Sequence, residues 1–390
     1  MRALCWLGDE GLGVREVPDP ELRNAADAVV RVRRSSTSGA DLPLLGGRMP
    51  YQSVGDVLGR EFLGDVVEVG SGVRRHRVGD RVVVCAVVAC GGCWFCRQGR
   101  YGCCDNGSTG PAVAEQAWGQ PTGGCFGQPR AAGGFAGGHA EYVRVPYADV
   151  GAFAVPESVD DDRAVFAADT VPTGWLGAEL GEVRPGDVVA VWGAGAVGQM
   201  TARAALLHGA SRVVVIDRHP DRLRATERHV GAETLDYEAT DVAAELRERS
   251  GGRGPDVCVE AVGAAGDGAG PRSLAERFAT AARAAPPDRP IAVREAVHAC
   301  RKGGTVVVLG AFAGGVDAFP LGAVMHKGLT VRSSRQHGQR LIPMLLERMA
   351  GGEIDTAHLA THHLPLEQGA HGYALFRDRV DGCLRTLFTP

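Results

Sequence analysis

Four cysteines in the run CGGCWFCRQGRYGCC have the spacing of a metal site: Cys90, Cys93, Cys96 and Cys104. Two-residue gaps followed by a seven-residue gap let four thiolates reach one ion, and a closed all-sulfur tetrahedron is the usual geometry of structural zinc. A disulfide pair or a redox CxxC motif uses only two cysteines and fits the pattern poorly. Cys103 adjoins the fourth position and could replace Cys104 as a ligand. The spacing therefore predicts one structural zinc ion.

A second motif, GAGAVG, follows an apolar run and opens a helical pattern. Gly193 permits a tight turn, Gly195 lets a pyrophosphate approach the backbone, and Gly198 lets the helix pack closely on the strand. Ala196 and Val197 begin the helix, whose free N–H groups face the phosphates. The strand–turn–helix context predicts a dinucleotide-binding loop.

Asp217 ends the next strand pattern, VVVID, about 20 residues after the glycines. A carboxylate there can accept hydrogen bonds from both hydroxyls of an adenosine ribose, which favours NAD because a 2′-phosphate would meet a like charge. Arg218 and Arg222 could stack on adenine, contact the phosphates or tolerate NADP. We therefore expect NAD, with NADP as the open alternative.

Two kinds of element pattern surround these motifs. The first 150 or so residues carry short β-rich runs, DAVVRVR, FLGDVVEVG, DRVVVCAVV and AEYVRVP, which are broken by glycine and proline and indicate a small, irregular β-barrel. From about Thr173 onward, uniformly apolar strand patterns alternate with helical ones, which is typical of a doubly wound parallel sheet in an α/β protein. The strand patterns include PDVCVEAVG and TVVVLGAF, and PIAVREAVHACRKG is a helical pattern ending at glycine.

Two further segments lie outside these patterns. An Ala/Gly/Pro-rich insertion covers residues 264–290 and reads either as a surface excursion with one short helix, or as a lid or subunit contact. The tail, from LIPMLLERMAGG to GCLRTLF, is expected to hold one helix and returning strands that fold back onto the first domain.

Composition excludes several classes of protein. The 390 residues suffice for two domains. The net charge of −4, from 42 basic and 46 acidic residues, argues against a nucleic-acid or anionic-membrane partner. No apolar run has the length of a membrane span, and the first residues lack the pattern of a signal peptide. The cysteines outside the clustered run are single, as free thiols of a reducing compartment are, so we expect a cytoplasmic protein.

Together these pieces resemble the zinc-containing medium-chain alcohol dehydrogenase family, nearly from end to end. VLGREFLGDVVEVG, VGDRVVV, the four-cysteine run, GGHAEYVRVP, DTVPTG and GAGAVG carry the resemblance, and GYALFRDRVDGCLRTLF is similar to the formaldehyde dehydrogenase-like branch. The resemblance implies a GroES-like β-barrel catalytic domain over residues 1–165, with a zinc lobe at about 88–106. It further implies a Rossmann domain over 166–325, a segment over 326–390 that completes the catalytic domain, and a homodimer or homotetramer.

The catalytic zinc site of the family is where this sequence departs from the resemblance. The family's first ligand is the cysteine of a CGTDxH-type motif, and here the run is SGADLP, with Ser38 at that position. The second ligand, the histidine of GHE, is replaced by Arg60, while the neighbouring Glu61 and the third ligand, Asp169, remain. A serine hydroxyl binds zinc poorly compared with a thiolate, and arginine is an obligate cation. We therefore expect no catalytic zinc.

The family's proton relay is also altered, because Ala40 and Pro43 occupy the positions of its hydroxyl residue and its histidine. Neither side chain can pass a proton. The candidate general acids are Ser38, Glu61, Asp169 and, more weakly, Tyr51. We hypothesise that Arg60 replaces the metal, neutralising Glu61 and Asp169 and stabilising developing negative charge. The alternative is that a metal survives on Asp169, Glu61 and another donor.

Thr173 resembles the family threonine that packs against the nicotinamide, so the cofactor site is predicted to be usable. The prediction is an NAD(P)-dependent oxidoreductase that transfers a hydride to or from an activated small molecule, such as an iminium, a conjugated double bond or a carbonyl. Three alternatives stay open: a zinc-dependent alcohol or aldehyde dehydrogenase with an atypical metal site, a non-redox cyclase or lyase, and a catalytically silent cofactor-binding protein.

Overall fold

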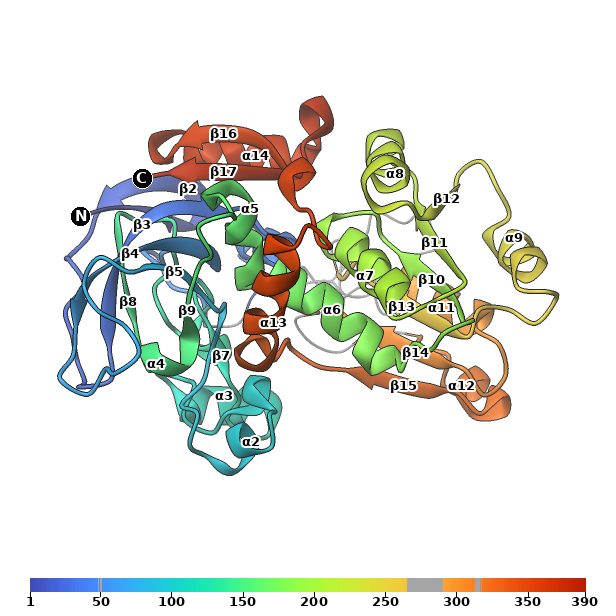
Figure 1. Ribbon diagram of the computed structural model, residues 1–390, viewed down its shortest axis with the longest axis horizontal. Coiled ribbons are helices and arrows are strands. Elements are labelled where there is room, and N and C mark those ends of the chain that lie inside the picture. Colours follow the sequence, from blue (N-terminus) through green and yellow to red (C-terminus); the bar gives the residue numbers. More distant parts are fainter. Residues whose placement is uncertain (48, 50, 265–289, 313–315, 317) are drawn as a thin grey trace. The chain divides into compact units, whose positions relative to one another are not determined.

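The computed structural model describes the whole chain except residues 48, 50, 265–289, 313–315 and 317 (Figure 1). Contacts divide it into one unit of Met1–Pro172 with Arg335–Pro390, and a second unit of Thr173–Ser334. The insertion expected at 264–290 lies almost wholly outside the described residues. Within the described part of the chain, no helix combines the length and apolar character needed to cross a membrane.

The first unit is built on a seven-stranded sheet with the order β16-β17-β3-β4-β5-β9, in which β8 also pairs with β3. Most neighbours are antiparallel, whereas β16 and β17 are parallel. The strands are β3 (Ala28–Ser36), β4 (Glu61–Val69), β5 (Arg81–Val84), β8 (Tyr142–Val145), β9 (Ala152–Ala154), β16 (Ala360–Pro365) and β17 (Arg385–Thr389). Two smaller sheets join β1 (Arg2–Trp6) to β2 (Leu12–Glu16), and β6 (Val87–Val88) to β7 (Gly124–Cys125).

Short helices connect these strands. Before the second unit begins they are α1 (Leu42–Leu45), α2 (Trp94–Arg97), α3 (Pro111–Trp118), α4 (Ala148–Gly151) and α5 (Asp161–Ala164), and α6 (Thr170–Gly181) crosses the boundary between the two units. The run DRVVVCAVV, expected as one strand, forms the two strands β5 and β6, because the backbone leaves the sheet after Val84.

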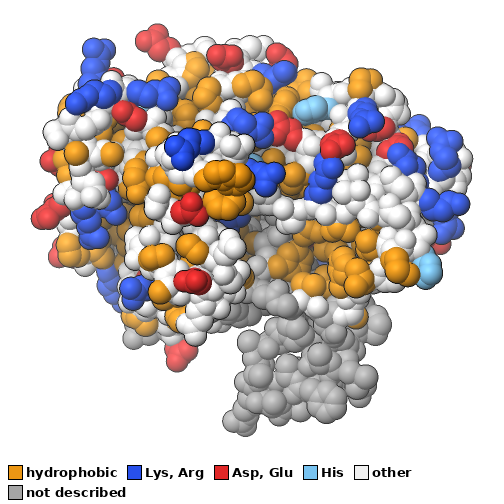
Figure 2. Space-filling view, turned by 90° about the horizontal axis from the view of Figure 1, so that it is seen from below, with side chains coloured by type: hydrophobic (Ala, Val, Ile, Leu, Met, Phe, Trp, Pro, Cys, Tyr) orange, Lys and Arg blue, Asp and Glu red, His pale blue; other side chains and the backbone are white. Residues whose placement is uncertain are grey.

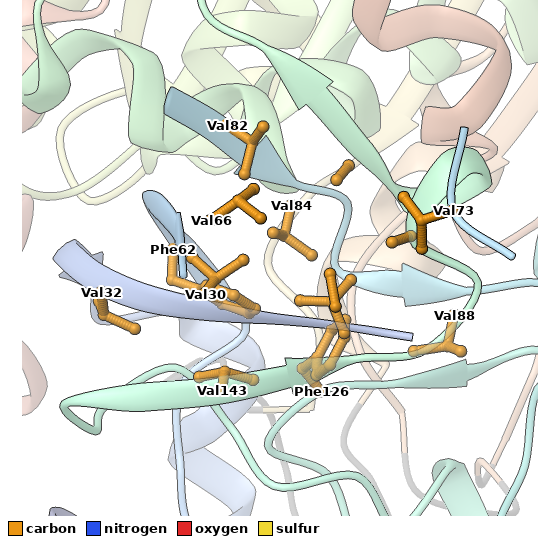
Figure 3. Close-up of a cluster of buried hydrophobic side chains, with 14 residues drawn as sticks. Val30, Val32, Phe62, Val66, Val73, Val82, Val84, Val88, Phe126 and Val143 are labelled. Carbon is orange, nitrogen blue, oxygen red and sulfur yellow. The ribbon is translucent and has the colours of Figure 1, made fainter. Parts of the chain in front are cut away.

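Aromatic and β-branched side chains fill the interior of the first unit. Phe62 and Phe126 meet edge to face with their ring centroids 5.2 Å apart, and Figure 3 shows them among the valines of β3, β4, β5 and β8. Edge-to-face pairs place the positive rim of one ring against the negative face of the other. This core holds β3 and β4 together at the ends from which the candidate site is built.

The tail folds back onto the first unit, as expected, but it contains two helices where one was expected. These are α13 (Gly338–Ala350) and α14 (Gly369–Asp378). Glycine weakens a helical sequence pattern, and α14 contains Gly369 and Gly372. A Cβ atom at these positions would lie 2.6 Å from Leu4 and 2.5 Å from Phe388 respectively. Close packing therefore requires the glycines that hide the helix from sequence reasoning.

The second unit is a six-stranded parallel sheet with the order β12-β11-β10-β13-β14-β15. Its strands are β10 (Val188–Trp192), β11 (Arg212–Asp217), β12 (Glu233–Asp236), β13 (Val257–Glu260), β14 (Thr305–Val308) and β15 (Thr330–Ser333). Its other helices are α7 (Ala196–Leu207), α8 (Pro220–Ala225), α9 (Val242–Arg249), α11 (Ile291–Ala299) and α12 (Leu321–Lys327). The doubly wound α/β prediction is confirmed, and β15 extends this sheet beyond residue 325.

Both faces of the parallel sheet are covered, which accounts for its uniformly apolar strands. On one face, side chains of α9, α11 and α12 pack with Ala190, Val214, Cys258 and Val306. On the other, the close approaches of Gly181 to Val257 and of Gly198 to Val191 bring α6 and α7 against the strands. Helix α11 ends at Ala299, before the glycine at which its end was expected.

Candidate active site and zinc lobe

The sulfur atoms of Cys90, Cys93, Cys96 and Cys104 lie within 4.8 Å of one another. The Sγ atoms of Cys93 and Cys104 are 3.9 Å apart, close to the edge of about 3.8 Å expected for a tetrahedron with Zn–S bonds of about 2.3 Å. Among the residues that the structure describes, these four are the one group of three or more His, Cys, Asp or Glu side chains arranged to hold a metal. The donor set fits a structural zinc ion.

Backbone and amide donors surround the same sulfurs. The N–H groups of Gly92 and Cys93 donate to Cys90 Sγ at 3.4 Å, and Asn106 donates to Cys104 Sγ from its backbone and to Cys90 Sγ from its side chain, both at 3.3 Å. Such donors stabilise the thiolate form that zinc requires. Cys103 lies outside the cluster, so Cys104 supplies the fourth sulfur.

The glycine-rich loop has the geometry that a dinucleotide needs. Gly193 has a φ of +101°, and a Cβ on Gly198 would lie 1.8 Å from the carbonyl oxygen of Gly193. Gly195 is the N-cap of α7, which begins at Ala196 and continues with Val197. The first N–H groups of α7 are free to bind phosphate oxygens. These residues fit an NAD(P) pyrophosphate.

Asp217, at the end of β11, is tied to this loop. Its Oδ2 accepts a 2.7 Å hydrogen bond from Ala194 N, and its Oδ1 accepts from Arg218 N at 2.7 Å and His219 N at 3.1 Å. A carboxylate offers about four lone-pair sites, so capacity for a ribose hydroxyl remains. Sequence reasoning assigned the ribose to Asp217 but missed that the same carboxylate fixes the backbone of the glycine loop.

The remaining cofactor candidates lie nearby within the second unit. Arg222 Nη1 is 3.9 Å from the place where a Cβ of Gly195 would stand, so its guanidinium lies over the loop. Arg218 donates to Glu238 Oε1 at 3.1 Å. Thr173 is half-buried in α6; its neighbour Gly174 would place a Cβ 2.6 Å from that of Met200, so α6 and α7 touch at this point.

Among the catalytic candidates, Arg60 lies between two carboxylates. Its Nε is 3.5 Å from Asp41 Oδ1, and its Nη1 is 3.8 Å from Asp169 Oδ2. Burial acts to lower the pKa of Arg60, but the negative charges of Asp41 and Asp169 outweigh it and shift the pKa upward. The charge of Glu61 adds to this upward shift of the pKa, so Arg60 stands near Glu61 and Asp169, as hypothesised. Asp41 is a further partner.

Glu61, the first residue of β4, has partners of its own. Its Oε1 accepts a 2.6 Å hydrogen bond from Thr170 N, at the start of α6, and Arg385 of β17 donates to Thr170 Oγ1 at 3.2 Å. Burial raises the pKa of Glu61 to about 7, while the nearby charge of Arg385 opposes the rise. Glu61 is wholly buried, and this burial favours its neutral, protonated form.

Ser38 and Tyr51 lie in different surroundings. Ser38 is 5% exposed and caps the short 3₁₀ helix Gly39–Asp41: its Oγ accepts from Ala40 N, and Asp41 Oδ2 accepts from Ser38 N at 3.0 Å. Tyr51 is 43% exposed and donates to Gln116 Oε1 at 2.7 Å. The structure therefore places Ser38 next to the Arg60 pair and directs the Tyr51 hydroxyl elsewhere.

The arginine–carboxylate cluster thus comprises Asp41, Arg60, Glu61, Asp169 and Arg385. Sequence reasoning missed Asp41 and Arg385. A signal for Asp41 was present, since it follows Ser38 by three residues in the run SGADLP and matches the spacing of a capping box. Arg385 gave no local signal, because only the return of β17 to β3 brings it near Glu61.

The zinc assignment leads to a matched pair of substitutions. Cys104→Ser should lower the zinc content from about one per chain to well below one, because three thiolates and a hydroxyl bind zinc weakly. Cys103→Ser should leave the zinc content unchanged. Elemental analysis of each purified variant measures the difference, and the reverse result would move the fourth ligand to Cys103.

The burial of Glu61 predicts a dependence of stability on pH. In the folded protein its pKa is about 7 and therefore above its ordinary value of 4.5, so its contribution to stability is complete below pH 4.5 and is lost as the pH rises through 7. Glu61→Gln cannot ionise. Between these pH values the free energy of unfolding of the wild type should fall relative to Glu61→Gln by up to about 3 kcal/mol.

Urea unfolding at pH 5 and pH 8 measures this change. Glu68, an exposed glutamate of the same strand, supplies the control, since Glu68→Gln should track the wild type at both pH values. A constant difference between wild type and Glu61→Gln would show that Glu61 is ionised in the folded protein over this range.

Comparisons with known proteins agree with this architecture. The alcohol dehydrogenase GroES-like domain family matches residues 24–157, and the zinc-binding dehydrogenase family matches residues 196–268. A zinc-type alcohol dehydrogenase-like protein of Bacillus subtilis is 32% identical over 392 aligned positions, which span all of both chains.

Solved structures show the same relationship. The alcohol dehydrogenase TADH from Thermus sp. ATN1 is 34% identical and superposes with a TM-score of 0.81 over all of this chain and 99% of its own. A zinc-binding dehydrogenase of Sinorhizobium meliloti 1021, solved bound to NADP, is 26% identical, with a TM-score of 0.76 over all of this chain and 99% of its own. The chain belongs to the zinc-type medium-chain alcohol dehydrogenase family of oxidoreductases.

Proposed function

We propose that the protein is an NAD(P)-dependent oxidoreductase that transfers a hydride to or from an activated small molecule without a catalytic zinc ion. The observation that carries this proposal is the position of Arg60, whose guanidinium is paired with Asp41 and Asp169. Among family members that use catalytic zinc, the residue before this glutamate is a histidine ligand.

Three features of the donor set disfavour a metal among these side chains. A guanidinium has no lone pair to give to a metal. The hydroxyl of Ser38 already accepts a hydrogen bond as a helix cap, and the carboxylate of Asp169 lies beside a fixed positive charge. We infer that this cation takes the place of the family's catalytic zinc. Zinc at this position would need another donor set.

The charge of Arg60 suits a particular kind of chemistry. A guanidinium held by carboxylates can stabilise negative charge that develops on a substrate, but it polarises a ground-state oxygen less than zinc does. Substrates that are already electrophilic need less polarisation. An iminium, a double bond conjugated to a carbonyl, or an activated carbonyl meets this requirement. The site would thus act on substrates that are electrophilic before they bind.

For the group that exchanges a proton with the substrate, we propose Asp169 ahead of Ser38 and Glu61. The Asp169 side chain is 16% exposed, whereas Glu61 is wholly buried and Ser38 is engaged as a cap. A proton donor must come within hydrogen-bond reach of the substrate. Partial exposure leaves Asp169 as the carboxyl group best able to do so.

For the cofactor, we propose NAD, with NADP as the alternative. Asp217 retains capacity for a ribose hydroxyl, and its negative charge disfavours a 2′-phosphate. Arg222 provides positive charge beside the loop, and Arg218 follows Asp217 directly and pairs with Glu238, so these cations keep NADP as the alternative. The nicotinamide would lie near Thr173, as in the family. The similarity of the tail to the formaldehyde dehydrogenase-like branch supports a small, reactive carbonyl compound as one class of substrate.

One observation favours a second candidate, a non-redox lyase or cyclase built on the same scaffold. Glu61 and the partly exposed Asp169 lie close enough for the charge of one to raise the pKa of the other, and such a pair of carboxyl groups can perform acid–base catalysis. In that case the nicotinamide would remain unchanged during turnover. Absorbance at the wavelength of reduced nicotinamide separates the two candidates.

The proposal predicts the metal content and the effect of removing the guanidinium. Protein purified without added metal should contain close to one zinc per chain. With NADH and cinnamaldehyde or a cyclic iminium as probes, Arg60→Met should lower kcat by about 10²- to 10³-fold and leave the Kd for NADH unchanged. Arg60→Lys, which keeps the charge, should retain part of the activity.

Each part of this experiment can contradict the proposal. A zinc content close to two per chain would show a second metal site. Full activity in Arg60→Met would remove the guanidinium from the chemistry. Parallel titrations with NADH and NADPH decide the cofactor, and product formation without a change in nicotinamide absorbance would favour the lyase or cyclase.

We further propose a cytoplasmic homodimer or homotetramer. The cysteines outside the zinc cluster are free and mostly buried, as suits a reducing compartment. Strand β15 ends its sheet, and Leu321 and Met325 of the adjacent α12 are 67% and 68% exposed. Figure 2 shows hydrophobic side chains gathered on this side of the second unit. A strand edge beside exposed apolar residues is a surface on which a second copy can bind.

The assembly proposal predicts that Met325→Glu lowers the mass measured by light scattering after gel filtration, because it places a charge in the subunit contact. Val54→Glu, at a position that is 69% exposed in the first unit, is the control and should not change the mass. A monomeric wild type would contradict the proposal.

A further inference from the structure

A chain of buried hydrogen bonds leads away from the Arg60 site into the interior of the first unit. His139 Nδ1 lies 2.8 Å from Ser35 Oγ, and His139 Nε2 lies 2.9 Å from the hydroxyl of Tyr373. That hydroxyl donates to Asp41 Oδ2 at 2.8 Å. Ser35, Asp41, His139 and Tyr373 are each no more than 1% exposed. Polar groups buried so deeply are costly unless they are fully paired.

Rigid elements hold the four residues. Ser35 lies on β3, Tyr373 on α14 and Asp41 at the end of the 3₁₀ helix Gly39–Asp41. The backbone of His139 is fixed on both sides, because its N–H donates to Leu58 O at 2.9 Å and its carbonyl accepts from Leu4 N at 2.8 Å. The ring of Phe388 meets the imidazole edge to face at 5.0 Å. Little freedom remains for the imidazole to turn.

The number of protons fixes the direction of the chain. The hydroxyl of Tyr373 has one proton, which goes to Asp41, so its oxygen must accept from His139 Nε2–H. Burial lowers the pKa of His139 to about 3, and the ring is therefore neutral. A neutral imidazole with a proton on Nε2 has a bare Nδ1 that accepts from the Ser35 hydroxyl. Every donor then points towards Asp41.

The opposite direction needs a different protonation state. If His139 Nδ1–H donated to Ser35, Nε2 would take the proton of Tyr373, and Asp41 would face the phenol oxygen with no proton between them. Only a proton on Asp41 would restore that hydrogen bond. Such a proton would remove the negative charge that faces Arg60 Nε at 3.5 Å. Burial raises the pKa of Asp41, and the charge of Arg60 and the hydrogen bond from Tyr373 oppose that rise. The direction of the hydrogen bonds and the charge of Asp41 are thus linked.

We propose that Tyr373 and His139 are positioning residues, which hold the Asp41 carboxylate in its charged form and thereby fix the guanidinium of Arg60 in the site. Asp41 Oδ2 receives two donors, Ser38 N–H and the Tyr373 hydroxyl, which leaves Oδ1 for Arg60. The role in catalysis rests on the proposed function. The arrangement of the chain does not depend on it.

Nuclear magnetic resonance can test the direction of the chain without a substrate. Long-range ¹H–¹⁵N spectra of protein labelled at histidine distinguish the two neutral tautomers, and His139→Gln identifies the signal. We expect the neutral Nε2–H tautomer at pH 6–8. An Nδ1–H tautomer or an imidazolium would overturn the proposal.

The positioning role is tested at Arg60 itself, by measuring the rate at which its Nε–H exchanges with solvent. The signal of this group is assigned by its loss in Arg60→Lys. Tyr373→Phe keeps the ring packing but removes one donor to Asp41, and should raise the exchange rate about tenfold. His139→Leu should have a similar effect. His139→Gln, whose amide can donate to Tyr373 and accept from Ser35, should restore a rate near that of the wild type.

Tyr147→Phe is the matched control, since the hydroxyl of Tyr147 donates to Asn106 O and takes no part in the hydrogen bonds that lead to Asp41. In this variant the exchange rate of the Arg60 Nε–H should equal that of the wild type. Unchanged exchange in Tyr373→Phe would overturn the positioning role even if the tautomer is as expected. With the cinnamaldehyde probe, Tyr373→Phe should lower kcat more than it changes KM. If the wild-type protein were inactive towards all hydride-transfer probes but the variants showed the expected exchange rates, the proposed function would be contradicted. The proposed arrangement of hydrogen bonds would still be supported.

Discussion

A guanidinium buried beside two carboxylates is the interaction on which the rest of the first unit's site depends. Removing charges from water is costly, and the mutual attraction of the charges offsets that cost only when the geometry is good and further hydrogen bonds complete the partners. Arg60 Nε and Asp41 Oδ1 are 3.5 Å apart, which is too long for a strong hydrogen bond. Burial raises the pKa of Asp41, and the charge of Arg60 and the hydrogen bond from Tyr373 are the main factors that oppose the rise, with the donor from Ser38 adding to them.

The tail of the chain supplies essential parts of this cluster. Arg385 on β17 provides a positive charge near Glu61, and Tyr373 on α14 provides the donor to Asp41. Both elements reach these positions because Gly369 and Gly372 allow α14 to pack against Leu4 and Phe388. A substitution that adds a side chain at either glycine would move the donors, since backbone packing and charge balance are coupled here.

Local features could be predicted from the sequence, and long-range pairings could not. The zinc cysteines and the glycine loop each lie within one short run, where spacing alone determines geometry, and the structure brings each set together. Asp169 was expected beside Arg60 because a family pattern placed both residues. Asp41 was not expected beside Arg60, because its position depends on the exact turn after β3. Arg385 and Tyr373 lie more than 300 positions from Glu61 and Asp41 respectively, and no periodicity connects such distant residues.

Since Asp41, Arg60 and Ser38 contact one another, a metal site would be difficult to build here by single substitutions. Arg60→His alone would leave the Asp41 carboxylate without its cation and the metal without its thiolate ligand. Ser38→Cys alone would remove the oxygen that caps the 3₁₀ helix and set a thiol near a guanidinium. Each of these single substitutions would cost stability without completing a set of metal ligands. The folding energetics of the pocket thus oppose the stepwise construction of a zinc site around Asp169.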